Sequence, residues 1–158
     1  MSDNIVHIDK LKYIRGFHFL VSFSDGINVK NMGWQEVSGF NAELQVEEVS
    51  EGGENQFTWR LPKPPRHKNL VLKRALGTKM DDLIKWAKEA IEGFVFKPAT
   101  VVVQITGDND EEVLRSWNFV GAYPVKIQTT ELSAQKGELV IETLELAYKY
   151  FIANDSKN

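Results

Sequence analysis

Apolar and polar residues alternate along several short segments of the chain, as they do in strands that bury one face. Residues 17–24 show the pattern clearly: their phenylalanines and Val21 fall on one side, and His18, Ser22 and Ser24 fall on the other. The segments that we expect to form strands, some with less strict alternation, are 17–24, 41–49, 55–61, 69–74, 100–106, 113–132 and 138–151.

One segment, residues 78–94, has the period of an amphipathic helix instead. We expect Thr78 to cap its N-terminus, Asp81 and Asp82 to occupy its first turn, and Gly93 to end it. The apolar stripe expected on this helix is Leu83, Ile84, Ala87, Ile91 and Phe94.

Turn-forming residues separate the expected strands at 25–26, in a Pro-rich run at 62–65, and at 107–110 and 135–137. Many short strands with one helix predict a mainly β fold, in which two packed antiparallel sheets form a sandwich or barrel. On this fold the expected core-facing residues of two strands are Ala42, Leu44, Val46, Val125 and Ile127.

The composition describes one folded domain. The chain has 158 residues, of which 42% are hydrophobic and 11% aromatic, so it can bury a sizeable core. No shift in composition divides it, and we expect a single domain over residues 1–158, with an N-terminal extension at 1–16 and a frayed tail at 153–158. It has no cysteine, which excludes disulfides and thiolate chemistry.

The net charge and the apolar runs limit the choice of partners. A formal net charge of −3 argues against nucleic acid as the main partner. The N-terminal residues lack the continuous apolar stretch of a signal peptide, and the longest aliphatic run is Val101 to Val103. We therefore expect assembly in a bacterial cytoplasm and no stable membrane insertion.

No motif in the sequence indicates catalysis. The three histidines, His7, His18 and His67, do not have the spacing of metal ligands, and no nucleophile elbow or phosphate-binding glycine loop is present. We expect neither a metal nor a cofactor, and we do not expect an enzyme. A hydrolase that uses two carboxylates stays an alternative, and its candidates are Glu43, Glu47, Glu48, Glu142 and Glu145.

Charges of opposite sign gather in consecutive segments. Acidic residues gather at 47–54 and basic residues at 63–74. One interpretation is an ordinary soluble surface; the other is a head-to-tail interface, in which the acidic loop of one copy meets the basic edge of the next. The basic edge consists of Lys63, Arg66, Lys68, Lys73 and Arg74.

An ordered set of short motifs resembles a known family. The motifs are EVSGF (36–40), EGG (51–53), LP (61–62), NLVLKR (69–74), Trp86, Trp117, AYPVK (122–126), EL (131–132) and IETLELAY (141–148). Together they resemble the tail tube proteins of contractile-tailed bacteriophages and the inner-tube proteins of phage-tail-like contractile injection systems. The resemblance extends from about Phe17 to about Tyr148.

The resemblance implies a structural role with several partners. Six protomers would close a ring around a shared inner β-barrel, and rings would stack into a tube inside a contractile sheath. Baseplate and tube-initiator proteins would be further partners, and cargo or DNA would pass through the channel. The chain would be the main tube subunit, or alternatively the ring that initiates the tube at the baseplate, in a phage tail or in a released or anchored injection particle.

The resemblance also assigns roles to residues. The long loop at residues 48–65 would reach a neighbouring ring, and its expected stacking residues are Glu48, Glu51, Gly52, Gly53 and Glu54. The polar faces of two strands would line the channel, with Glu43, Gln45, Glu47, Lys126, Gln128 and Thr130 as candidates. A monomeric β-barrel that binds a small apolar ligand is the alternative from a different functional class.

Overall fold

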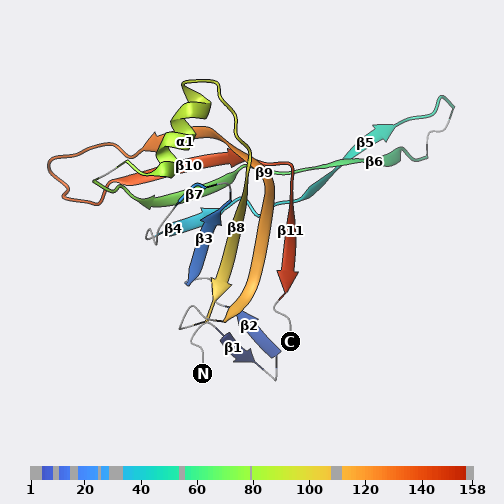
Figure 1. Ribbon diagram of the computed structural model, residues 1–158. Coiled ribbons are helices and arrows are strands. Elements are labelled where there is room, and N and C mark those ends of the chain that lie inside the picture. Colours follow the sequence, from blue (N-terminus) through green and yellow to red (C-terminus); the bar gives the residue numbers. More distant parts are fainter. Residues whose placement is uncertain are drawn as a thin grey trace.

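The protein folds into antiparallel strands joined to a helix (Figure 1). The structure is a computed structural model that describes residues 5–8, 11–14, 18–24, 26–28, 34–53, 56–78, 80–107 and 112–155. The elements are β1 (Ile5–Ile8), β2 (Leu11–Ile14), β3 (Phe19–Phe23), β4 (Trp34–Ser38), β5 (Glu43–Val49), β6 (Trp59–Arg66), β7 (Leu70–Ala75), α1 (Asp82–Ile91), β8 (Ala99–Thr106), β9 (Val113–Thr129), β10 (Ile141–Ala147) and β11 (Tyr150–Asp155). The expected mainly β fold with one flanking helix is confirmed.

The long strand β9 belongs to two sheets. Sheet 1 contains β3, β8, the first half of β9 and β11, and sheet 2 contains the second half of β9, then β10, β7 and β4. The change of partners comes next to Gly121, whose φ is 66°, and to a bulge opposite Leu146. Glycine adopts positive φ at little cost, so β9 can bend here and carry the chain from one sheet to the other.

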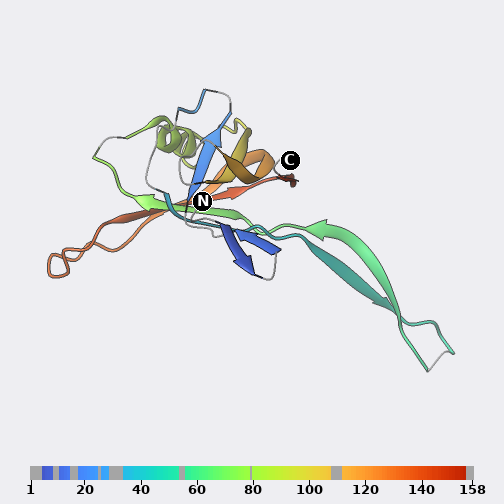
Figure 2. The same cartoon turned by 90° about the horizontal axis from the view of Figure 1, so that it is seen from below.

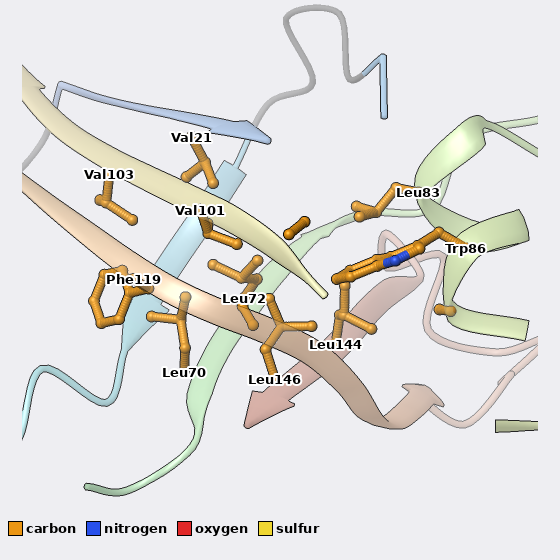
Figure 3. Close-up of a cluster of buried hydrophobic side chains, with 13 residues drawn as sticks. Val21, Leu70, Leu72, Leu83, Trp86, Val101, Val103, Phe119, Leu144 and Leu146 are labelled. Atoms are coloured by element: carbon orange, nitrogen blue, oxygen red, sulfur yellow. The ribbon is translucent and has the colours of Figure 1, made fainter. Parts of the chain in front are cut away.

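The core lies between the two sheets and beneath α1 (Figure 3). Val101 and Phe119 reach it from sheet 1, Leu72 and Leu144 from sheet 2, and Trp86 from α1. Every second residue of β7 and of β10 is buried, which is the period of strands with one face on a core.

Helix α1 starts later than expected. Asp81, and not Thr78, is the N-cap: its carboxylate accepts a hydrogen bond from the backbone N–H of Ile84 at 3.1 Å. Asp81 also binds Arg74, and this second contact holds the carboxylate at the helix N-terminus. The expected cap at Thr78 was wrong because the sequence pattern does not reveal that Arg74 holds the Asp81 carboxylate at the helix N-terminus.

The buried face of α1 also differs from the expected stripe. Leu83, Ile84 and Ala87 are buried as expected, whereas Ile91 and Phe94 are exposed. Trp86 and Ala90 are buried in their place. The helix ends at Ile91, so Phe94 lies beyond it, and Ile91 lies on the exposed side of its last turn.

A two-stranded hairpin of β5 and β6 extends away from the two sheets, as Figures 1 and 2 show. We call residues 43–66 the arm. Leu44 is 59% exposed, and Val46 is exposed as well. The expectation that they face the core, together with Ala42, was wrong: alternation predicts one apolar face, but not that the same chain covers it.

The Pro-rich run is part of a strand and not the expected turn. Pro62, Pro64 and Pro65 lie within β6, which pairs with β5 alone among the described residues. Proline cannot donate a ladder hydrogen bond, but it is tolerated on a strand with a free outer edge.

Of the two expected core residues on β9, Val125 is exposed and Ile127 packs against the core.

The two remaining extremities are the segment between β9 and β10 and the end of β11. Figure 2 shows residues 130–140 extending from the side opposite the arm. Strand β11 runs to Asp155, whose carboxylate lies 3.5 Å from Arg115 Nη2. Residues 153–155 are therefore strand rather than frayed tail, and 156–158 lie outside the described residues.

Candidate assembly surfaces

Sheet 2 has an unpaired edge on each side within the part of the chain that the structure describes. Strand β4 pairs only with β7. Strand β8 follows β9 no further than Ala122, and β10 occupies the other edge of β9 from Tyr123 to Thr129. The second half of β9 thus leaves one edge of backbone N–H and C=O groups without a strand partner. Such an edge is a template for pairing with another chain.

The face of sheet 2 that points away from the core carries polar residues in registered rows. One row crosses the four strands as Gln128, Thr143, Lys73 and Glu36. Lys73 Nζ donates to Glu36 Oε2 at 2.9 Å, so the two charges in this row are paired.

The two charged residues of the next row are also paired with each other. It consists of Lys126, Glu145, Val71 and Ser38, and Lys126 Nζ lies 3.4 Å from Glu145 Oε1. The Asn69 amide donates to the other oxygen of Glu145 at 3.4 Å. The face is polar but nearly neutral, because each of these lysines lies beside a glutamate on the neighbouring strand.

The structure separates the six expected channel residues. Lys126 and Gln128 lie on this polar face, and Thr130 follows directly, where its hydroxyl accepts a hydrogen bond from the Ile141 N–H at 3.1 Å. The other three expected residues lie on β5 in the arm and not on sheet 2; they are Glu43, Gln45 and Glu47. Glu36, Thr143 and Glu145 share the polar face, although the resemblance did not assign them to the channel.

Acidic and basic residues of the arm pair with each other. Glu47 Oε2 lies 3.2 Å from Lys63 Nζ, and Glu48 Oε1 lies 3.8 Å from Arg60 Nε. All four side chains are largely exposed, and such pairs contribute about 1 kcal/mol or less. These pairs therefore add little to the stability of the arm.

The other expected stacking residues lie near the arm's tip. Glu51, Gly52 and Gly53 form an exposed turn in which Gly53 has a φ of 104°. Glu54 lies outside the described residues. Of the expected basic edge, Arg66 ends β6 and Lys68 follows it, and both are exposed.

Two aromatic side chains stand exposed on the arm. Phe57 and Trp59 pack edge to face with ring centroids 5.3 Å apart, and about half of each side chain is accessible. Large aromatic residues of this kind are the usual anchors of protein interfaces.

The base of the arm is held by a cluster of contacts. His67 Nδ1 lies 3.0 Å from the carbonyl oxygen of Asn41, and its ring packs against Tyr148 and Phe151. The Tyr148 hydroxyl donates to the Gly39 carbonyl at 3.3 Å. Burial raises the pKa of Tyr148, so the hydroxyl keeps the proton that it donates. The cluster fixes the direction in which the arm leaves the body.

Arg74 is buried and does not belong to a surface edge. It is 5% exposed; its Nε donates to Glu142 at 2.9 Å, and its two terminal nitrogens donate to Asp81 at 2.6 and 3.1 Å. Burial alone would lower the pKa of Arg74, but the hydrogen bonds and charges of the two carboxylates outweigh burial and raise it. Its guanidinium also lies over the Trp34 ring. Arg74 is therefore not exposed at the expected basic edge. Instead it links α1 to sheet 2 through Asp81 and Glu142.

The described residues offer little to support catalysis. Among them no three histidine, aspartate or glutamate side chains are grouped to hold a metal ion. Glu142, a candidate for the carboxylate hydrolase, is buried against Arg74, and Glu47, Glu48 and Glu145 each pair with a basic residue. No helix within the described ranges is long and apolar enough to span a membrane.

Comparisons with known proteins agree with a tube fold. Residues 15–152 match the family described as T4-like virus tail tube protein gp19. The chain belongs to this tail tube family. Tail tube proteins are structural, and the expected role as a structural tube subunit is confirmed at this level. No curated protein matches this chain.

Several solved structures are similar to this tail tube protein. A chain in the six-fold-symmetrised baseplate of the anti-feeding prophage is 27% identical, with 89% of this chain and 95% of that chain covered and a TM-score of 0.74. A chain of the extended sheath–tube complex of the PVC extracellular contractile injection system is 20% identical, with 90% of this chain and 92% of that chain covered and a TM-score of 0.76. Hcp1 from Flavobacterium johnsoniae is 16% identical, covering 89% and 97%, with a TM-score of 0.57.

Proposed function

We propose that the chain is the protomer of an inner tube, in which six copies close a ring and the rings stack within a contractile sheath. The observation that carries the proposal is sheet 2, which combines two unpaired edges with a polar outer face. Pairing the β4 edge of each copy with the β9 edge of the next would remove both edges and close a barrel.

The strand directions favour this closure. Sheet 2 contributes four strands in alternating directions, because β9 pairs antiparallel with β10, β10 with β7, and β7 with β4. Copies related by rotation about the ring axis keep their strand directions. Strand β4 of one copy would therefore run antiparallel to β9 of the next, and the alternation would continue around the ring.

The polar rows of sheet 2 suit the wall of a channel. The core and α1 lie on one side of the sheet, so its polar face would point inward once the ring closes. Water or a polar cargo would meet paired charges and amides there. A nearly neutral wall would not hold DNA or protein cargo by charge, whereas a strongly basic one would retain DNA.

The comparisons support the number of copies and the partners. The similar chain from the anti-feeding prophage belongs to a six-fold-symmetrised baseplate, and the PVC chain belongs to a complex of sheath and tube. By analogy, the chain would assemble in a bacterial cytoplasm with sheath, baseplate and tube-initiator partners. It would have no catalytic activity and no stable membrane insertion.

A ring that initiates the tube at the baseplate is a second candidate role. The similar chain with 27% identity comes from a baseplate structure, and this observation favours a position near the baseplate. The two roles differ in stacking. A ring of main tube subunits would bind further rings of the same protein on both of its faces, whereas an initiator ring would bind such rings on one face or on neither.

Sedimentation and negative-stain electron microscopy of the purified protein test the proposal. We expect hollow rings at low concentration and stacked rings at high concentration. Single rings that never lengthen would favour the initiator. Compact monomers at every concentration, able to retain a hydrophobic dye with saturable stoichiometry, would contradict the tube and support the ligand-binding alternative.

A further inference from the structure

An aromatic projection follows helix α1. Phe94 is 82% exposed, and its ring packs edge to face against Phe96 with centroids 4.9 Å apart. Phe96 in turn contacts Tyr123 on the second half of β9, at 5.6 Å. The projection, residues 94–96, is therefore fixed beside the unpaired β9 edge of sheet 2.

The backbone at Phe94 is strained. Its φ is 55°, and no other non-glycine residue among those described has a positive φ. Gly93 does not take this position; a Cβ there would lie 2.8 Å from the Glu89 carbonyl oxygen, so glycine serves close packing instead. The turn is closed by the Val95 N–H, which donates to the same oxygen at 3.0 Å. Strain that presents an exposed phenylalanine to solvent indicates a role beyond the fold of this chain.

An apolar pocket of about 460 Å³ opens on the other side of the molecule, between edge strands β3 and β4. Its lining includes Phe19 and Val37 from these strands, Val103 from β8, and the aromatic rings of Phe40 and Trp117. Pockets of roughly 300–1,000 Å³ hold small molecules, so this one has room for a phenyl ring.

The projection and the pocket lie at opposite edges of sheet 2. Figure 1 shows α1 and the segment after it at the β9 end of the sheet, and β3 with β4 at the other end. Helix α1, which leads into the projection, packs on the core through Trp86, and the pocket residue Val37 packs against the same core. If copies pair edge to edge, the projection of one copy comes next to the pocket of the following copy.

We infer that Phe94 of one copy inserts into the β3–β4 pocket of the next copy in the ring. The inference rests on the proposed ring and names a contact within it. The occupant is a second copy of this chain because the pocket continues the proposed edge-to-edge interface and is apolar, as the exposed ring is. A docked phenyl ring would secure β4 against β9 of its neighbour from the side opposite the channel.

A substitution at Phe94 separates docking from folding. Asparagine tolerates positive φ but has no apolar ring, and the relieved backbone strain offsets the lost ring contact with Phe96, so Phe94→Asn should keep the Tm of the protomer within about 4 °C of wild type. Burying a phenylalanine changes a binding constant by one to two powers of ten, so each contact should weaken at least tenfold. Leu132→Asn is the matched control, because Leu132 is 79% exposed and lies in the segment between β9 and β10, outside the pocket and the projection.

Analytical ultracentrifugation across a concentration series gives the readout. We expect Phe94→Asn to shift the ring–monomer midpoint to at least tenfold higher concentration, while Leu132→Asn keeps the wild-type midpoint. Rings of wild-type strength from Phe94→Asn would overturn the inference and leave the ring proposal intact. A protomer Tm lowered by more than about 4 °C would also overturn it, because Phe94 would then serve its own fold.

Cross-linking locates the contact, since the chain has no cysteine of its own. Gln35 lines the pocket on β4, so Phe94→Cys combined with Gln35→Cys should give a ladder of covalent oligomers under oxidising conditions. Each single variant should give dimers at most. Rings without a ladder would overturn the docking site alone, whereas wild-type protein that never forms rings would overturn the proposed function and this inference with it.

Discussion

Replacing Arg74 by methionine should destabilise the protomer strongly. The change removes the only buried cation that the described residues place beside Glu142 and Asp81, and Glu142 is itself only 5% exposed. Buried Glu142 and partly buried Asp81 would both lose their cationic partner. Removing one member of a buried ion pair typically costs about 3–5 kcal/mol. In a domain of this size each kcal/mol lowers the Tm by about 2–4 °C, so we expect a loss on the order of 10 °C.

Thermal unfolding followed by circular dichroism measures this loss, and urea unfolding gives the free energy independently. The control restores neutrality: Arg74→Met together with Glu142→Met and Asp81→Asn should recover most of the stability, because asparagine still caps α1. Arg74→Met with a Tm within about 2 °C of wild type would refute the idea that this cluster holds α1 on sheet 2.

Three further predictions concern the arm and the helix cap. Gly39→Ala should destabilise the protomer and loosen the arm, since Gly39 has a φ of 101° and an added Cβ would overlap the Asn69 carbonyl. Thermal unfolding would measure the loss of stability and limited proteolysis the loosening of the arm, and an unchanged Tm would contradict the prediction. Burial would raise the pKa of Asp81, but the hydrogen bonds that Asp81 accepts from Arg74 and from the helix N-terminus outweigh burial and lower this pKa. The ionised carboxylate therefore stabilises the fold above the usual pKa of 3.8, and this stabilisation is lost as the pH falls below that value. The Tm difference between wild type and Asp81→Asn should narrow below that pH, and a difference that stays constant with pH would exclude the effect. Trp59→Ser, on the exposed arm, should leave the protomer Tm nearly unchanged yet shorten the tubes seen by electron microscopy, and tubes of normal length would show that the arm's aromatic pair does not join rings.

Local periodicity predicted the elements whose partners lie in the same chain. Strand β3 buries Val21 and exposes Ser22, as the alternation of its residues indicates. Strand β7 likewise alternates between buried and partly buried positions. In these segments the apolar face and the core belong to the same molecule, so the pattern contains the information needed.

The pattern failed where a partner is distant or absent. Leu44 alternates like a core residue but lies on the arm, because nothing in its period tells one chain's core from a contact with a second chain. Arg74 sits in a basic run, yet it alternates with Lys73 across β7 and therefore faces inward. A strict period-2 assignment of residues 69–74 would have placed it in the core. The positive φ of Phe94 had no sequence signal, because the neighbouring Gly93 is the residue type expected there.

The motifs carried more information than the periodicity about function. The ordered motifs indicated the tail tube family, and the match over residues 15–152 confirmed it. They did not indicate which residues would meet between copies. That question depends on which strand edges stay unpaired, and the unpaired edge of β9 becomes visible only once the bend at Gly121 is known.

The most direct test of this account is a cryo-electron microscopy map of rings assembled from the purified protein. We expect a closed barrel in which β4 of each copy pairs antiparallel with the second half of β9 of the next. Lys126 and Glu145 would then face the channel. Rings joined through other strands, or rings that turn this polar face outward, would contradict it.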